Sequence, residues 1–113
     1  MDKQLKILAL ALALAAGTSA QAADNSDIEA LRSRIASGET QAAWQQAQQM
    51  RASHESDTEF DFLYGLLALD NNQYNEAQFA LERVTLAEPT NARARLALAK
   101  TYFKLGDQHS ARR

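Results

Sequence analysis

Residues 58–91 read T-E-F-D-F-L-Y-G-L-L-A-L-D-N-N-Q-Y-N-E-A-Q-F-A-L-E-R-V-T-L-A-E-P-T-N. The stretch contains two amphipathic segments of helix length, which meet at the polar residues 71–73. The second segment stops at Pro89, the only proline of the chain. The pattern therefore predicts two helices joined by a tight turn, which places them side by side and antiparallel.

Each of the two segments carries a small residue where the helices would meet. Gly65 lies in the first segment and Ala77 in the second, and with so little side chain at these positions two helix backbones can approach closely. We expect Tyr74, Phe79 and Leu81 to fill the space beside them.

This stretch resembles a tetratricopeptide repeat, whose pattern has small residues at its eighth and twentieth positions, an aromatic residue at its seventeenth and proline at its thirty-second. The matching residues here are Gly65, Ala77, Tyr74 and Pro89. The resemblance implies an all-α fold, a solenoid of antiparallel helix pairs.

The same features recur at the 34-residue period of the family. We shifted Gly65, Asn72 and Ala77 by 34 residues in both directions. Five of the positions reached hold small residues, Gly38, Ala43, Ala99, Gly106 and Ala111, and the one exception is Leu31. We therefore predict about two and a half units: a degenerate unit at residues 24–57, the best match at 58–91 and a truncated unit at 92–113.

Six helices are expected in these units. Capping boxes at Ser26 and Ser56 open the first and third helices, Asn91 and Asp107 cap the fifth and sixth, and Gly38 ends the first. The expected extents are residues 26–38, 40–52, 58–71, 74–88 and 92–105, followed by a short sixth helix from residue 107.

Residues 1–22 have the three parts of a secretory signal peptide: two early lysines, an apolar run at residues 7–16 and a small-x-small site ending at Ala22. We predict cleavage after Ala22, with cleavage after Ala20 as the alternative. An apolar helix of that length rises about 15 Å, which is roughly half of a bilayer core, so no transmembrane helix is expected in the mature chain. The sequence thus predicts an exported, periplasmic protein with one domain at residues 23–113.

Composition excludes several classes of protein. Cysteine is absent, which excludes a disulfide framework and a lipid-modified cysteine. Residues 23–91 hold 12 acidic and 4 basic side chains, whereas residues 92–113 hold 1 acidic and 6 basic ones. The basic run is short and no readout motif accompanies it, so we expect no nucleic acid partner.

The sequence offers no catalytic, cofactor or metal site. The two histidines, His54 and His109, lie far apart without ligand spacing, and we expect both to be solvated. The carboxylates of Asp57, Glu59 and Asp61 fall in a first helical turn, where they complement the helix dipole without any catalytic role. We therefore predict that the protein is not an enzyme and carries no cofactor.

The resemblance also implies a binding surface, because in this family certain positions of each repeat line a concave groove that holds peptides. Carried onto this sequence, those positions include a groove set of Arg32, Phe62, Leu66, Leu69, Arg93, Leu96, Lys100, Phe103 and Lys104. Ile28 and Arg32 replace the Lys and Asn of the family's known carboxylate clamp, so that specificity is not implied. An apolar strip flanked by cations suits a peptide with apolar side chains and an acidic or C-terminal carboxylate group. The alternative is that the apolar side chains contact a further repeat.

The function that follows is a periplasmic scaffold or adaptor that binds another protein. The alternative is a docking arm of a larger outer-membrane assembly or export protein with its active domain beyond Arg113. The run N-A-R-A-R-L-A-L-A-K-T-Y-F-K-L-G-D is similar to the repeats of surface lipoprotein assembly modifiers. Self-association through an unfinished C-terminal edge is a further possibility.

Overall fold

The computed structural model describes residues 26–111, and their side chains as far as Asp107. The chain divides into two compact units, residues 1–30 and residues 31–113. Of the first unit the described residues are 26–30, which are helical, so the predicted signal peptide lies outside the described part. None of the helices in the described part has the length and apolar character needed to cross a bilayer.

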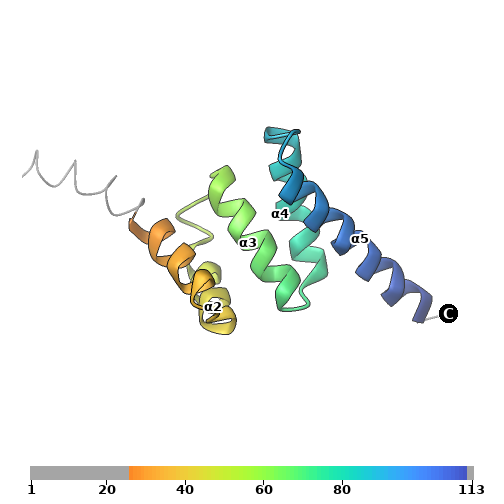
Figure 1. Cartoon of the computed structure of the whole chain (residues 1–113), viewed down its shortest axis with the longest axis horizontal. Coiled ribbons are helices and arrows are strands. Elements are labelled where there is room, and N and C mark those ends of the chain that lie inside the picture. The colour runs from red at the N-terminus through yellow and green to blue at the C-terminus, as the bar shows by residue number, and fades with distance from the viewer. Residues whose placement is uncertain (1–25, 112–113) are drawn as a thin grey trace, which may run out of the picture. The chain divides into compact units, whose positions relative to one another are not determined.

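The second unit is built from helices alone over its described residues. It begins with helical residues 31–36 and continues with α2 (Thr40–Met50), α3 (Thr58–Asp70), α4 (Tyr74–Ala87) and α5 (Ala92–Ala111). Figure 1 shows α3 and α4 side by side, joined by the short turn at residues 71–73, with α5 packed against α4. The prediction of an all-α fold made of antiparallel helix pairs is confirmed.

The helices α3 and α4 approach each other closely at Gly65, as predicted. A Cβ atom on Gly65 would lie 2.7 Å from Cγ of Leu81. Ala77, Leu81 and Val84 of α4 are completely buried, and so is Ala43 of α2. The small residues therefore do allow helices to pack closely.

Phe79 does not fill the space beside this contact, and that expectation is wrong: its side chain is 60% exposed. The inward positions of α4 are 77, 80, 81 and 84, which follow the three- and four-residue spacing of one helix face. Residue 79 lies two positions after 77, so it points away from α3. Tyr74, at the start of α4, is half-buried.

The start of α3 also differs from the expected one. Asp57 is the N-cap residue, and its Oδ1 accepts hydrogen bonds from the backbone N–H groups of Glu59 (3.1 Å) and Phe60 (3.3 Å). Ser56, the predicted cap, instead has a left-handed backbone with φ of 66°. Two other predicted helix boundaries are confirmed: Asn91 accepts a bond from Ala94 N at 3.0 Å, and Gly38 ends the first helix with φ of 81°.

The predicted fifth and sixth helices form one continuous helix, α5, which runs through Gly106. Asp107 is therefore inside a helix and caps nothing. A glycine inside a helix costs about 1 kcal/mol, whereas the few described residues after it are too few to form a stable separate helix. No packing partner for such a helix is present in the described part of the chain. A continuous α5 therefore costs less free energy than a break at Gly106.

Candidate protein-binding surface

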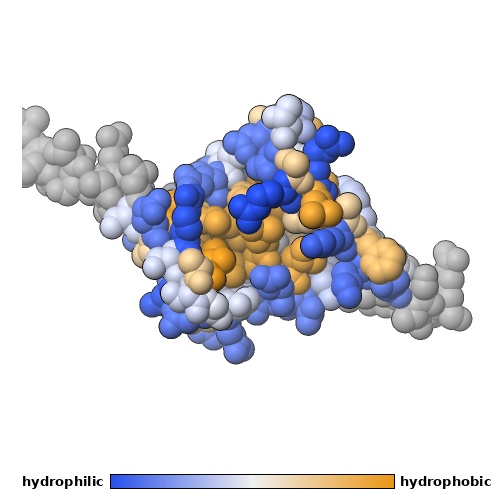
Figure 2. Space-filling view, viewed as in Figure 1, coloured by the Kyte–Doolittle hydropathy of each residue, from blue (hydrophilic) through white to orange (hydrophobic). Residues whose placement is uncertain are grey.

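Apolar side chains of α3 and α5 lie at the surface of the second unit. On α3, Phe62, Leu66 and Leu69 are half-buried. On α5, Leu96 is 58% exposed and Phe103 is 69% exposed. Figure 2 shows apolar surface over α3 and the beginning of α5, bordered by hydrophilic residues. Exposed apolar area of this kind usually marks a contact surface.

A pocket of about 500 Å³ lies where the end of α3 and the following turn meet α5. Its lining residues are Leu69, Asp70, Asn72, Tyr74, Ala99, Lys100, Phe103 and Lys104. The structure thus brings four members of the predicted groove set together, Leu69 from α3 and Lys100, Phe103 and Lys104 from α5. We refer to this hollow as the α3–α5 pocket.

The remaining members of the groove set lie outside this pocket. The guanidinium of Arg93 lies 5.6 Å from the centre of the Phe62 ring, a cation–π contact between α5 and α3. Arg32 is ion-paired with Glu59, so its charge is already matched within the chain. Leu66 and Leu96 add apolar area on α3 and α5.

The cations of the α3–α5 pocket are its two lysines. Lys100 and Lys104 are exposed and one helical turn apart, and the described residues give neither of them an ion pair. Asp70 lies in the same lining, so the pocket presents both signs of charge around apolar Leu69 and Phe103. Such a lining suits a short peptide that carries an apolar side chain next to a carboxylate.

Four residues that line the pocket are not in the predicted groove set: Asp70, Asn72, Tyr74 and Ala99. Asn72 has φ of 62°, the left-handed conformation that asparagine tolerates in a turn. Its side-chain Oδ1 accepts a hydrogen bond of 2.8 Å from the hydroxyl of Tyr74. The N-N-Q-Y run signalled a turn, but only the fold shows that this turn borders α5.

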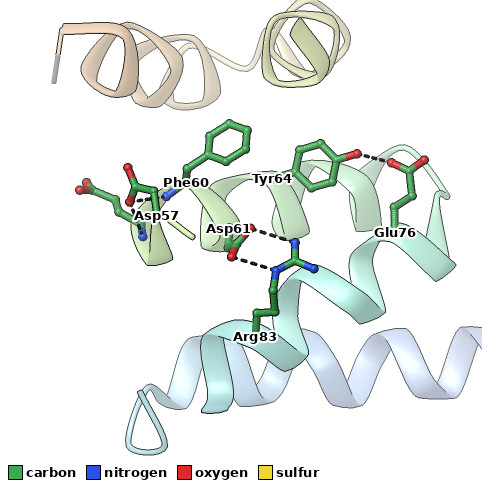
Figure 3. A network of polar contacts seen from close by, with 7 residues as sticks. Asp57, Phe60, Asp61, Tyr64, Glu76 and Arg83 are labelled. Carbon is green, nitrogen blue, oxygen red and sulfur yellow. Dashed lines mark hydrogen bonds and ion pairs between the residues drawn. The ribbon is translucent and has the colours of Figure 1, made fainter. Parts of the chain in front are cut away.

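Polar contacts join α3 and α4, as Figure 3 shows. Asp61 is buried and accepts two hydrogen bonds from Arg83, from Nε and from a terminal nitrogen, each 3.0 Å long. This pairing raises the pKa of Arg83. Burial and a hydrogen bond to Glu76 raise the pKa of Tyr64. Each group is matched by its partner, so this network stabilises the helix pair. Asp61 therefore does more than complement the helix dipole.

His54 is buried, and the expectation that it is solvated is wrong. Its ring stacks on Phe60 at 5.3 Å between centroids, and its Nδ1 lies 3.7 Å from a carboxylate oxygen of Asp57. Its Nε2 is buried and has no hydrogen-bond partner among the residues that the structure describes. The residues that the structure describes contain no cluster of three or more His, Asp or Glu side chains that could hold a metal ion.

Comparison with known proteins agrees with this architecture. Residues 68–113 match the family model described as Tetratricopeptide repeat, a segment that includes all of α4 and α5. No curated protein and no solved structure shows a significant match to the chain. Tetratricopeptide repeats generally mediate protein–protein interaction and are typically not enzymes. The repeat match and the exposed helix surfaces therefore both point to a protein-binding role.

Proposed function

We propose that this chain is an interaction module that binds an acidic peptide segment of a partner protein along α3 and α5. The observation that supports it most is the α3–α5 pocket, in which Lys100 and Lys104 stand beside the apolar Leu69 and Phe103. An apolar side chain of the peptide would enter the pocket, and a neighbouring or C-terminal carboxylate would meet the lysines. The rest of the groove set would contact the peptide on either side.

Each exposed lysine contributes modestly. A solvent-exposed ion pair is worth about 0.2–1 kcal/mol, so each lysine accounts for a change in affinity of at most about five-fold. The apolar contact supplies the larger share, because burying one large apolar side chain is worth about 1.5–3 kcal/mol.

A pair of matched peptides tests the proposal. The probe is the fluorescent pentapeptide Ala-Leu-Ala-Leu-Asp with a free C-terminus, and the control is Ala-Leu-Ala-Leu-Asn with a C-terminal amide. Fluorescence anisotropy should show tighter binding of the acidic probe, and this preference should disappear in a variant with Lys100→Glu and Lys104→Glu. Arg34→Glu reverses one positive charge away from the pocket and should leave the preference intact. Equal binding of both peptides, or a preference that survives in the double variant, would refute the basic pocket.

The setting of this module is part of the proposal. The signal-like residues 1–22 support export to the periplasm, where the partner would be another exported or outer-membrane protein. Mass spectrometry of the chain purified from a periplasmic extract should give an N-terminus at Ala23. A product that keeps Met1 and stays inside the cell would overturn export without touching the binding proposal.

A further inference from the structure

A hollow of about 640 Å³ lies where the end of α2, the connecting residues 51–57 and the start of α3 meet, and we call it the α2–α3 hollow. Its volume falls within the range of about 300–1,000 Å³ that is typical of small-molecule sites. No member of the predicted groove set lines it, so it is separate from the proposed peptide site. Its lining includes Arg51, His54, Glu55, Phe60 and Arg83.

His54 is the buried polar side chain of this lining, with only 5% of the residue exposed. Its Nδ1 lies 3.7 Å from a carboxylate oxygen of Asp57, which favours a proton on Nδ1. The neutral ring then carries a lone pair at Nε2, and none of the described residues donates a hydrogen bond to that nitrogen. A buried acceptor without a donor costs free energy. A ligand that brings a hydroxyl group to Nε2 therefore removes this cost.

Two guanidinium groups in the same lining can hold an anion. Arg51 is exposed, its guanidinium carbon lies 5.3 Å from the centre of the Tyr64 ring, and it forms no ion pair with the described residues. Arg83 bonds Asp61 through two of its five N–H donors, which leaves the other donors for a ligand (Figure 3). Planar guanidinium groups match the oxygens of carboxylates and phosphates.

We propose that the α2–α3 hollow binds a small oxyanion that also carries a hydroxyl group, as hydrogen phosphate and hydroxy acids do. The anionic oxygens accept hydrogen bonds from Arg51 and Arg83, and the hydroxyl group donates to Nε2 of His54. Because Nε2 is closed to solvent, the ligand displaces part of the lining when it binds. Arg51 and Glu55 are long, exposed side chains, and such side chains change rotamer within nanoseconds.

Glu55 opposes the binding of an anion. Its carboxylate lines the hollow and forms no ion pair with the described residues, whereas the carboxylate of Asp61 is matched by Arg83. Glu55→Gln removes this repulsion and should tighten the binding of an oxyanion, by up to about five-fold. Weaker binding to Glu55→Gln would show that the hollow selects a cation and would refute the oxyanion.

Two matched pairs of probes test the need for a hydroxyl group. Inorganic phosphate and sulfate share a tetrahedral shape, but at neutral pH only phosphate keeps a proton. Glycolate and acetate are both carboxylates, but only glycolate has a hydroxyl group. In NMR titrations of the whole chain, phosphate or glycolate should bind about two- to ten-fold more tightly than its matched probe, the change expected from one hydrogen bond. A preference within the first pair indicates a phosphate site, and a preference within the second indicates a site for hydroxy acids. Equal binding within both pairs would refute the proposal.

The imidazole nitrogens of His54 supply a direct measurement in the natural chain. A hydrogen bond accepted at Nε2 should shift the NMR signal of that nitrogen when the ligand is added, and the signal is assigned by its loss in His54→Phe. Arg51→Glu should abolish the shift while circular dichroism shows an intact helical fold. Arg34→Glu changes a residue that does not line the hollow and should leave the shift unchanged. A His54 signal that stays constant at saturating ligand, or a shift that survives in Arg51→Glu, would overturn the proposed site.

Discussion

Gly65 and Leu81 lie so close together that no side chain fits between them: a Cβ atom on Gly65 would lie 2.7 Å from Cγ and 2.8 Å from Cδ2 of Leu81. Leu81 is completely buried and comes from the middle of α4, so it cannot swing aside into solvent. The contact therefore allows α3 and α4 to approach more closely than a larger residue at position 65 would permit.

Gly65→Ala should destabilise the fold. The added methyl group forces α4 outward or Leu81 off its rotamer, which costs about 1–3 kcal/mol, partly offset by about 0.5–1 kcal/mol from the better helix propensity of alanine. Urea unfolding followed by circular dichroism should therefore show a net loss of up to about 2.5 kcal/mol.

Gly106→Ala is the matched control for that experiment. A Cβ atom at Gly106 meets nothing within 4 Å, and the residue lies inside α5. This variant should gain roughly 0.5–1 kcal/mol, since only the helix propensity changes. A loss of stability in Gly106→Ala would mean that the chain turns at this residue instead of continuing as a helix. Equal stability of the two variants would contradict the close contact at Gly65.

Arg83→Met should destabilise the helix pair by leaving Asp61 buried without its partner. Losing the hydrogen bonds of a buried charged group costs about 1–3 kcal/mol, and the lower half of this range is expected because the side chain of Arg83 is 56% exposed. Chemical denaturation measures the change.

Arg95→Met serves as the control for Arg83→Met, because the same chemical change on the neighbouring helix breaks no ion pair with the described residues. It should change stability by less than about 0.5 kcal/mol. Adding Asp61→Asn to Arg83→Met should recover part of the loss. If the double variant is as unstable as Arg83→Met alone, the unpaired carboxylate of Asp61 is not the cause of the lost stability.

Asp57→Ala should shorten or weaken the start of α3. Removing an N-cap carboxylate that accepts two backbone N–H groups costs about 0.5–2 kcal/mol. Ser56→Ala, one residue earlier, removes no capping bond and should stay within about 0.5 kcal/mol of the natural chain. Thermal unfolding of the two variants distinguishes Asp57 from Ser56 as the cap. If Ser56→Ala is less stable than Asp57→Ala, Ser56 is the N-cap residue and the predicted capping box is correct.

Much of the helical core could be predicted from the sequence, because small residues that recur at a fixed interval mark the places where two helices can pack closely. The spacing of Gly65 and Ala77 was enough to place them between two helices. Residue type was enough to predict that a helix ends at Gly38 and that another begins after Asn91. The cap at Asp57 was missed because Ser56 also fits the capping pattern, and only the backbone conformation decides between them.

The sequence did not show the direction of individual side chains. It also did not show that the predicted fifth and sixth helices are one continuous helix. Phe79 was assigned to the interior by residue type, although its position on the α4 helix points it outward. His54 was assigned to solvent for the same reason, yet the loop before α3 buries it against Phe60. The turn expected at Gly106 depends on a packing partner, so the local pattern alone could not decide it. The groove set itself stays a prediction, with four of its members now known to line one pocket.

Tyr102→Phe should raise the pKa of Glu82. The hydroxyl of Tyr102 donates a 2.6 Å hydrogen bond to the carboxylate of Glu82, and this bond is the main cause that holds the pKa of Glu82 below its ordinary value. A second bond, from the side-chain amide of Gln78, remains in the variant, so the pKa should move only part of the way back. An NMR titration of the Glu82 carboxyl carbon measures the change.

The same bond makes a pH-dependent contribution to stability. Because the pKa of Glu82 is lower in the folded chain than in the unfolded one, the contribution is fully present above the ordinary value of 4.5 and is lost as the pH falls through the folded value. The difference in unfolding free energy between the natural chain and Tyr102→Phe should therefore be constant near neutral pH and shrink in acid. Tyr74→Phe is the control, since the hydroxyl of Tyr74 bonds an uncharged amide, Asn72, and its loss should leave the titration of Glu82 unchanged. A Glu82 titration that is identical in all three chains would show that Tyr102 does not hold this carboxylate in solution.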